Sequence, residues 1–131
     1  MISFDTFKPT EGTPIYQQIL LYIKRGAVAG TIRDGDELPS RRVLSALLGI
    51  NPNTVQKAFH LLEEEELIVS QAGAKSVMKI TEEKIQKLRE DLLREDIRSI
   101  TGALRQMGIS REEAFKLIDQ FWEEEETNVR D

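Results

Sequence analysis

Cysteine is absent from this chain of 131 residues, and histidine occurs once, as His60. Without cysteine there is no disulfide and no thiolate metal site, and a single histidine is a poor basis for structural zinc. We therefore expect no metal and no cofactor. Long apolar runs are missing too, and the N-terminus lacks a basic-then-apolar signal pattern, so we expect a cytoplasmic protein with no membrane partner.

The residues that an enzyme needs are equally scarce. His60 lies on the polar face of a helix pattern, and no nucleophile can be paired with it as base. There is no phosphate-binding glycine loop, and the carboxylates belong to exposed helix patterns. We expect no enzymatic activity.

The net charge of −5 is confined to the C-terminal part. Residues 1–80 hold 9 Lys+Arg and 9 Asp+Glu, whereas residues 81–131 hold 9 and 14, which gives 0 and −5. The acidic balance is therefore compatible with a nucleic-acid-binding head. Few cations predict modest non-specific affinity, which a dimer would raise by doubling their number.

Two short helices joined by a tight turn are predicted between Leu38 and Leu62. Ser40 is a good N-cap for the first, and Gly49 can take the left-handed conformation that ends it. Asn51 then caps the second helix, and Pro52 suits its first position. Apolar residues recur at helical spacing in both helices, namely Val43, Leu44, Leu47 and Leu48, then Val55, Ala58, Phe59 and Leu62.

The second of these helices has a polar leading edge. Its outward residues are amides, a hydroxyl and a cation, which suit base edges and phosphates in a major groove. The whole stretch carries Arg41, Arg42 and Lys57 without any acid, a local charge of +3. This favours a helix-turn-helix, although spacing alone leaves an ordinary helical hairpin open.

The segment from Gly35 to Ile68, GDELPSRRVLSALLGINPNTVQKAFHLLEEEELI, resembles the signature of the GntR family of bacterial transcription regulators. PIYQQI at residues 14–19 and NPNTVQKA at residues 51–58 are similar to its small YtrA-type branch. The resemblance covers residues 4–80. It implies a winged helix-turn-helix in an α+β, mainly α chain, and a double-stranded DNA operator as partner.

Matching the family's motifs gives the candidate DNA contacts. Arg42 matches the arginine of the LPSxR pattern and, with Ser40 or Arg41, should hold phosphates. Asn53, Thr54 and Lys57 match the start of the recognition helix. The full predicted set is Ser40, Arg41, Arg42, Asn51, Asn53, Thr54, Gln56, Lys57, His60 and Lys75.

Residues 67–80 are expected to form the wing. Leu67 to Val69 predicts a strand, residues 71–74 a turn, and Val77 to Ile80 the return strand. The family's wing tip usually carries arginines and glycines, whereas this chain has Gln71 and Ala72 at the basic positions. Lys75 stands where a glycine is expected and can supply one phosphate contact.

A second departure from the family pattern lies at the end of the recognition helix. Glu66 stands where the family tends to have a glycine, and it ends a run of four carboxylates that begins at Glu63. We interpret this run as a solvated face remote from DNA.

Around this motif, the N-terminal residues should complete the head. Ile2, Phe4 and Phe7 alternate with polar residues and are expected to lie against it. Thr13 as cap and Pro14 as first residue predict a helix that forms the third wall of the core.

The tail reads as a helical hairpin, which divides the chain into a DNA-binding domain at 1–80 and a dimerisation tail at 81–131. Thr81 caps a long amphipathic helix that ends near Gly108, and Ser110 with Glu113 opens a last helix. Two helices cannot hide this much apolar surface, so we favour a homodimer over a hairpin folded back on the head. The predicted dimer residues are Leu88, Leu92, Ile97, Ile100, Leu104, Phe115, Ile118, Phe121 and Trp122.

The resulting hypothesis is a transcription regulator that binds an inverted repeat as a homodimer, and the resemblance to YtrA-type regulators suggests that it is a repressor. The alternative is a protein-interaction module that uses its acidic tail, which leaves the surface from Leu38 to Leu62 unexplained. A small-molecule effector would need to sit in the dimer interface or between tail and head, with Phe121 and Trp122 as candidates. Aromatic residues on a helix face are usually core, so we name no effector.

Overall fold

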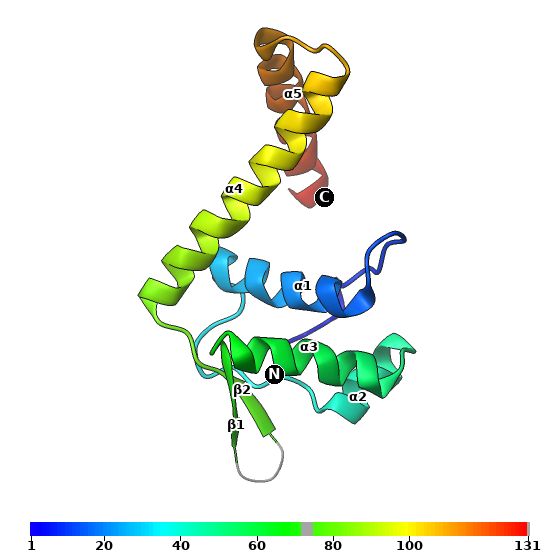
Figure 1. Cartoon of the computed structure of the whole chain (residues 1–131), viewed down its shortest axis with the longest axis vertical. Coiled ribbons are helices and arrows are strands. Elements are labelled where there is room, and N and C mark those ends of the chain that lie inside the picture. Colours follow the sequence, from blue (N-terminus) through cyan, green and yellow to red (C-terminus); the bar gives the residue numbers. More distant parts are fainter. Residues whose placement is uncertain (72–74, 131) are drawn as a thin grey trace. The chain divides into compact units, whose positions relative to one another are not determined.

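The computed structural model describes residues 1–71 and 75–130 of the chain, so most of the turn predicted at residues 71–74 lies outside the described residues (Figure 1). The elements are α1 (Ile15–Ala29), α2 (Arg41–Leu48), α3 (Pro52–Glu64), β1 (Ile68–Gln71), β2 (Lys75–Met78), α4 (Glu82–Gln106) and α5 (Arg111–Arg130). This is the mainly α fold with a small β-hairpin that the sequence predicts. Across the described residues, every helix is too short or too polar to cross a bilayer.

Tertiary contacts divide the chain into two compact units, Met1–Asp91 and Leu92–Asp131. The division lies within α4, later than the boundary predicted at residue 80, because the first turns of α4 pack on the head. Leu88 is only 9% exposed and belongs to the head's apolar core, with Ile85 packed against it. Leu88 was predicted to face a partner subunit, but the structure buries it in the core of its own head.

Three helices and the N-terminal segment enclose the core of the head. α1 and α3 lie side by side (Figure 1), and Ile19, Ile23 and Phe59 between them are almost fully buried. Ile2 and Phe4 are buried against the same cluster, and the Ile2 amide donates to the Glu37 carbonyl at 2.7 Å. The expected packing of the N-terminal segment on the head is confirmed.

Helix α2 buries fewer of its apolar residues than their spacing predicts. Leu44 is fully buried and Leu48 partly, but Val43 and Leu47 are exposed. The reason is geometric, because this helix of 8 residues packs on α3 along one side only.

The start of α1 differs from the prediction by one residue. Ile15 is the first helical residue, and Pro14 precedes it with an extended ψ of 140° and no side-chain cap. The Thr13 hydroxyl does not cap the helix as predicted. The carbonyl of Thr13 instead accepts a hydrogen bond from the Gln18 side-chain amide at 2.7 Å. The same amide donates to the Thr10 carbonyl at 2.9 Å, so Gln18 fastens the preceding loop to α1.

The wing is a two-stranded antiparallel sheet whose register runs from Ile68 opposite Met78 to Gln71 opposite Lys75. The return strand was predicted to reach Ile80, but it ends at Met78. The Ile80 amide donates instead to the Asp34 carboxylate at 2.8 Å, which removes it from the strand ladder. Val77 also forms a bridge to Glu37, so the base of the wing is held by the loop that precedes α2.

The C-terminal unit begins at Leu92 and contains the rest of α4 and all of α5. Ser110 accepts from the Glu113 amide at 3.2 Å, as expected of an N-cap, and Gly108 has the positive φ of 71° at the turn. Most large apolar side chains of this unit are exposed to solvent, among them Ile97, Ile100, Met107, Phe115, Phe121 and Trp122.

Candidate nucleic-acid interface

The turn between α2 and α3 is fixed by local hydrogen bonds. Ser40 accepts from the Val43 amide at 3.1 Å and so caps α2, which ends at Gly49 with a φ of 66°. Asn51 accepts from the Asn53 amide at 2.8 Å, and Pro52 is the first residue of α3. Both predicted caps are confirmed. The oxygens of Ser40 and Asn51, two of the predicted DNA contacts, are therefore already in use as caps.

Helix α3 has one buried face and one polar face. Its buried residues are Val55, Ala58, Phe59 and Leu62, as the spacing predicts. Asn53, Gln56, Lys57 and His60 are exposed and Thr54 is partly buried, while the first turn carries no acidic residue. A helix with this leading edge can enter a major groove without repelling the phosphates.

Arg42, Asn53 and Gln56 are the exposed predicted contacts whose side chains are unengaged in the described residues. Each is exposed, and in the described part of the chain none has a side-chain hydrogen bond or ion pair. Arg42 lies in the first turn of α2 and the other two on the outer face of α3, so one cation and two amides are available to a ligand.

Four other predicted contacts have partners within the chain. The Lys57 ammonium lies 4.0 Å from the ring centroid of Tyr16 on α1, a cation–π contact. His60 Nε2 is 3.0 Å from Glu64, and Lys75 Nζ is 3.5 Å from Glu37. The fourth is Arg41, whose Nη2 lies 3.3 Å from Glu63 Oε1. The pairs of His60 and Lys75 are exposed, and such pairs are weak and can be exchanged for phosphate contacts.

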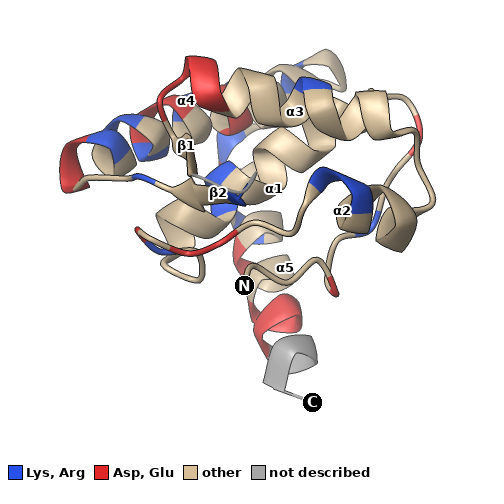
Figure 2. Cartoon of the chain, turned by 90° about the horizontal axis from the view of Figure 1, so that it is seen from below, with Lys and Arg blue, Asp and Glu red and all other residues tan. Residues whose placement is uncertain are grey.

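Three of the four carboxylates at the end of α3 each lie next to a basic side chain, so they are more ordered than the freely solvated face expected from the sequence. Glu65 pairs with Lys24 at 2.8 Å, Glu64 with His60, and Glu63 with Arg41. Figure 2 shows this acidic turn at the C-terminal end of α3 and the basic residues at the start of α2. The basic start of α2 therefore lies beside the acidic end of α3, where Arg41 pairs with Glu63, while the first turn of α3 carries no acidic residue.

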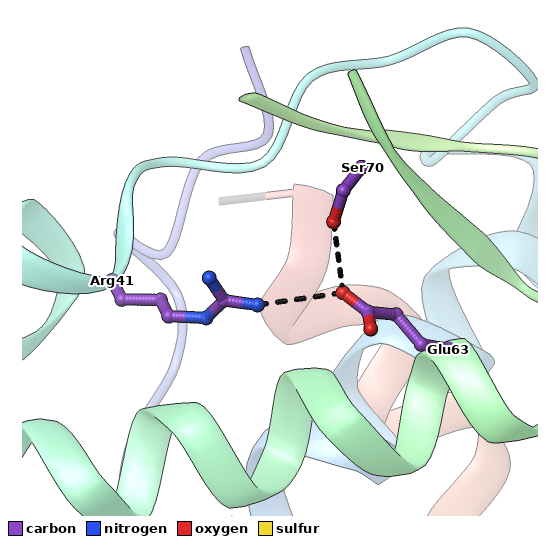
Figure 3. A network of polar contacts seen from close by, with 3 residues as sticks. All are labelled: Arg41, Glu63 and Ser70. Carbon is purple, nitrogen blue, oxygen red and sulfur yellow. Dashed lines mark hydrogen bonds and ion pairs between the residues drawn. The ribbon is translucent and has the colours of Figure 1, made fainter. Parts of the chain in front are cut away.

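Sequence reasoning missed Tyr16 and Glu63, which contact members of the predicted set, and Ser70, which contacts Glu63. Tyr16 lies within the PIYQQI segment, but its contact with Lys57 depends on how α1 packs on α3. Glu63 was assigned to a remote solvated face, yet its carboxylate also accepts the Ser70 hydroxyl of β1 at 3.0 Å (Figure 3). No local pattern indicates such contacts between elements.

A helix-turn-helix whose second helix leads with polar side chains, followed by a two-stranded wing, defines a winged helix-turn-helix DNA-binding domain. The family model described as bacterial regulatory proteins, gntR family, matches residues 15–76. The HTH-type transcriptional repressor YtrA of Bacillus subtilis is 42% identical over 73 residues, which cover 56% of this chain and 54% of that protein. The chain therefore matches about half the length of this curated relative.

Solved structures extend the match over the tail. A GntR family transcriptional regulator from Listeria monocytogenes is 30% identical with a TM-score of 0.75, covering 86% of this chain and 98% of that one. YtrA from Sulfolobus acidocaldarius, a GntR-family transcription factor, is 30% identical with a TM-score of 0.51, covering 94% and 97%. The chain belongs to the GntR family, is similar to its YtrA-type members, and is a DNA-binding transcription regulator of this type.

Proposed function

We propose that this regulator is a repressor that binds an inverted-repeat operator as a homodimer. The observation that carries the DNA-binding half is the acid-free leading edge of α3, where Asn53 and Gln56 are exposed and unengaged in the described residues; Arg42 is likewise exposed on α2. Repression is supported by the similarity to the Bacillus subtilis repressor.

The homodimer is supported by the tail. Ile97 is 58% exposed, Phe121 56% and Trp122 68%, on two helices that follow one another in the chain. A monomer that exposes such side chains together on amphipathic helices carries an apolar surface that a partner would bury. A second copy supplies the same surface around a two-fold axis, which is the symmetry of an inverted repeat. The proposed dimer residues are Leu92, Ile97, Ile100, Leu104, Phe115, Ile118, Phe121 and Trp122, so residues 1–80 read DNA and the tail pairs the subunits.

Within the head, we assign different roles to two of the free side chains. Arg42 is proposed to hold a phosphate, because a cation at a helix start reads charge rather than sequence. Asn53 is proposed to contact a base edge, since a side-chain amide can donate and accept at once and so distinguishes adenine from other bases.

The test is a titration of the full chain against an operator selected from random duplexes and against a scrambled duplex. We expect Arg42→Ala to weaken binding to both duplexes similarly and to make the salt dependence shallower. We expect Asn53→Ala to weaken the operator selectively, by roughly 1 to 3 kcal/mol of discrimination. A uniform loss in both variants would contradict this division of roles.

The spacing of the two half-sites tests the dimer on the same operator. Inserting about 5 base pairs, half a helical turn, would turn one half-site to the opposite side of the duplex. We expect this insertion to abolish tight binding, and an insertion of about 10 base pairs to restore part of it. Equal binding to all three duplexes would exclude recognition by paired heads.

A further inference from the structure

Arg41 is directed into the protein although it belongs to the basic start of α2. Its guanidinium carbon lies 5.5 Å from the centroid of the Phe59 ring, and its Nη2 lies 3.3 Å from Glu63 Oε1. Its Nε is buried without a hydrogen-bond partner in the described residues, and the side chain as a whole is 33% exposed. Arg42, the next residue, is exposed and unpaired there. Two adjacent arginines of equal charge therefore have opposite environments.

The partner of Arg41 is itself held in place. Glu63 Oε1 accepts the Ser70 hydroxyl at 3.0 Å as well as the Arg41 guanidinium, so one oxygen joins α2, α3 and β1 (Figure 3). The Glu63 side chain is 34% exposed, and partly buried charge pairs are screened less by salt than pairs in open water. The hydroxyl of Ser70 keeps the carboxylate turned toward Arg41, and the face of Phe59 holds the other side of the guanidinium.

We propose that Glu63 is a positioning residue that neutralises Arg41 and withholds it from the DNA backbone, so that Arg42 alone of the two arginines binds phosphate. This inference rests on the proposed function, because it concerns how strongly the head binds any duplex. The affinity of a protein for DNA of any sequence grows with the number of phosphates that its cations neutralise. Glu63 would therefore limit sequence-independent binding, while the amides of α3 continue to read the bases.

The first measurement compares Glu63→Gln with the unchanged chain on the operator and the scrambled duplex over a range of salt concentrations. Glutamine keeps the size of the side chain and an acceptor for Ser70 but removes the charge that holds Arg41. We expect affinity for both duplexes to rise by roughly fivefold per subunit at 0.15 M salt, and the salt slope to steepen by about 0.9 per subunit. A change in folding alone would not steepen this slope.

The second measurement assigns the effect to Arg41. Arg41→Gln by itself is expected to leave the salt slope nearly unchanged, because that cation does not touch DNA in the unchanged chain. In the double variant Arg41→Gln with Glu63→Gln, the rise should disappear. Glu64→Gln removes the same charge one residue along α3, next to His60 rather than Arg41, and is expected to raise affinity much less.

Two results would overturn the proposal. One is a salt slope shallower by about 0.9 per subunit in Arg41→Gln, which would show that Arg41 binds phosphate. The other is an equal rise in DNA affinity in Glu63→Gln and Glu64→Gln, which would mean that the effect comes from the net charge of the head and not from Arg41. If Glu63→Gln fails to fold, Ser70→Ala can replace it, because it removes the hydrogen bond to the Glu63 carboxylate and keeps both charges. We expect a smaller rise in DNA affinity in this variant. No rise would count against the proposal. Equal binding of operator and scrambled DNA by the unchanged chain would instead refute the proposed function.

Discussion

Glu66 has a φ of 59°, the left-handed backbone conformation that glycine adopts most easily. The residue ends α3: its amide donates to the Glu63 carbonyl at 2.9 Å, and the next amide, of Leu67, donates to the Leu62 carbonyl at 2.9 Å. This pair of hydrogen bonds is the Schellman motif, in which glycine is the usual residue. The sequence comparison with the family expected glycine at this position, and the backbone gives the physical reason.

Replacing Glu66 with glycine is expected to stabilise the head. A residue with a β-carbon loses roughly 1 to 2 kcal/mol in this conformation, and the greater freedom of glycine in the unfolded chain offsets up to about 1 kcal/mol of the gain. We expect Glu66→Gly to raise the free energy of unfolding by about 0.5 to 1 kcal/mol, measured by urea denaturation at fixed protein concentration. Glu66→Ala removes the same charge but keeps the β-carbon, so an equal gain in both variants would assign the effect to charge.

Residue by residue, the sequence predicts what depends on near neighbours. Ser40, Asn51 and Gly49 were identified correctly because caps and helix ends are set within a few residues. Arg41 was predicted to hold phosphate, and its partner Glu63 lies 22 residues further along the chain. That pairing depends on how α2 packs on α3 and on the position of Ser70, so the charge pattern of the sequence does not reveal it.

At the scale of elements, α3 depends on Asn51 to begin where it does. The side chain satisfies the Asn53 amide, and N-caps of this kind are each worth about 1 kcal/mol. We expect Asn51→Ala to lower the free energy of unfolding by that amount. Asn51→Ser keeps a capping oxygen and should retain both stability and DNA affinity.

Asn51→Asp separates the cap from the DNA interface. It is expected to keep the stability, because aspartate caps as well as asparagine, and to weaken DNA binding, because its carboxylate would face the phosphates. Urea denaturation and DNA titration of the three variants measure the two properties separately. If Asn51→Ser keeps its stability but loses operator binding, the amide of Asn51 contacts DNA directly, and the capping role is not its only one.

Helix α4 illustrates the limit of periodicity for an entire element. Its apolar residues recur at steps of three and four from Ile85 onward, and the helix was predicted correctly from them. The same pattern hides a change of role along the helix, because Leu88 is buried in the head whereas Ile97 is exposed. Periodicity identifies the face of a helix that will be covered, but only the surrounding fold decides what covers it.

At the scale of the whole molecule, dimerisation through the tails is proposed to strengthen DNA binding by the heads, but the two properties can be changed separately. The head has its own core, and residue 97 lies outside the unit Met1–Asp91. A charge placed in the tail's apolar surface should therefore separate the subunits without unfolding the head. Two heads joined in a dimer bind their second half-site at an effective concentration that separate heads lack.

Ile97→Glu is expected to convert the dimer into a monomer, because burying an unpaired carboxylate in an apolar interface is strongly unfavourable. Ser99→Glu adds the same charge two residues further along α4, at an exposed polar position, and should leave the dimer intact. Light scattering gives the mass of each variant. We expect the monomer to bind the full operator roughly a hundredfold more weakly than the dimer does. A duplex with a single half-site should bind both variants equally. If Ile97→Glu stays dimeric, or if a monomer binds the full operator as tightly as the unchanged chain, the tail does not pair the heads for DNA recognition.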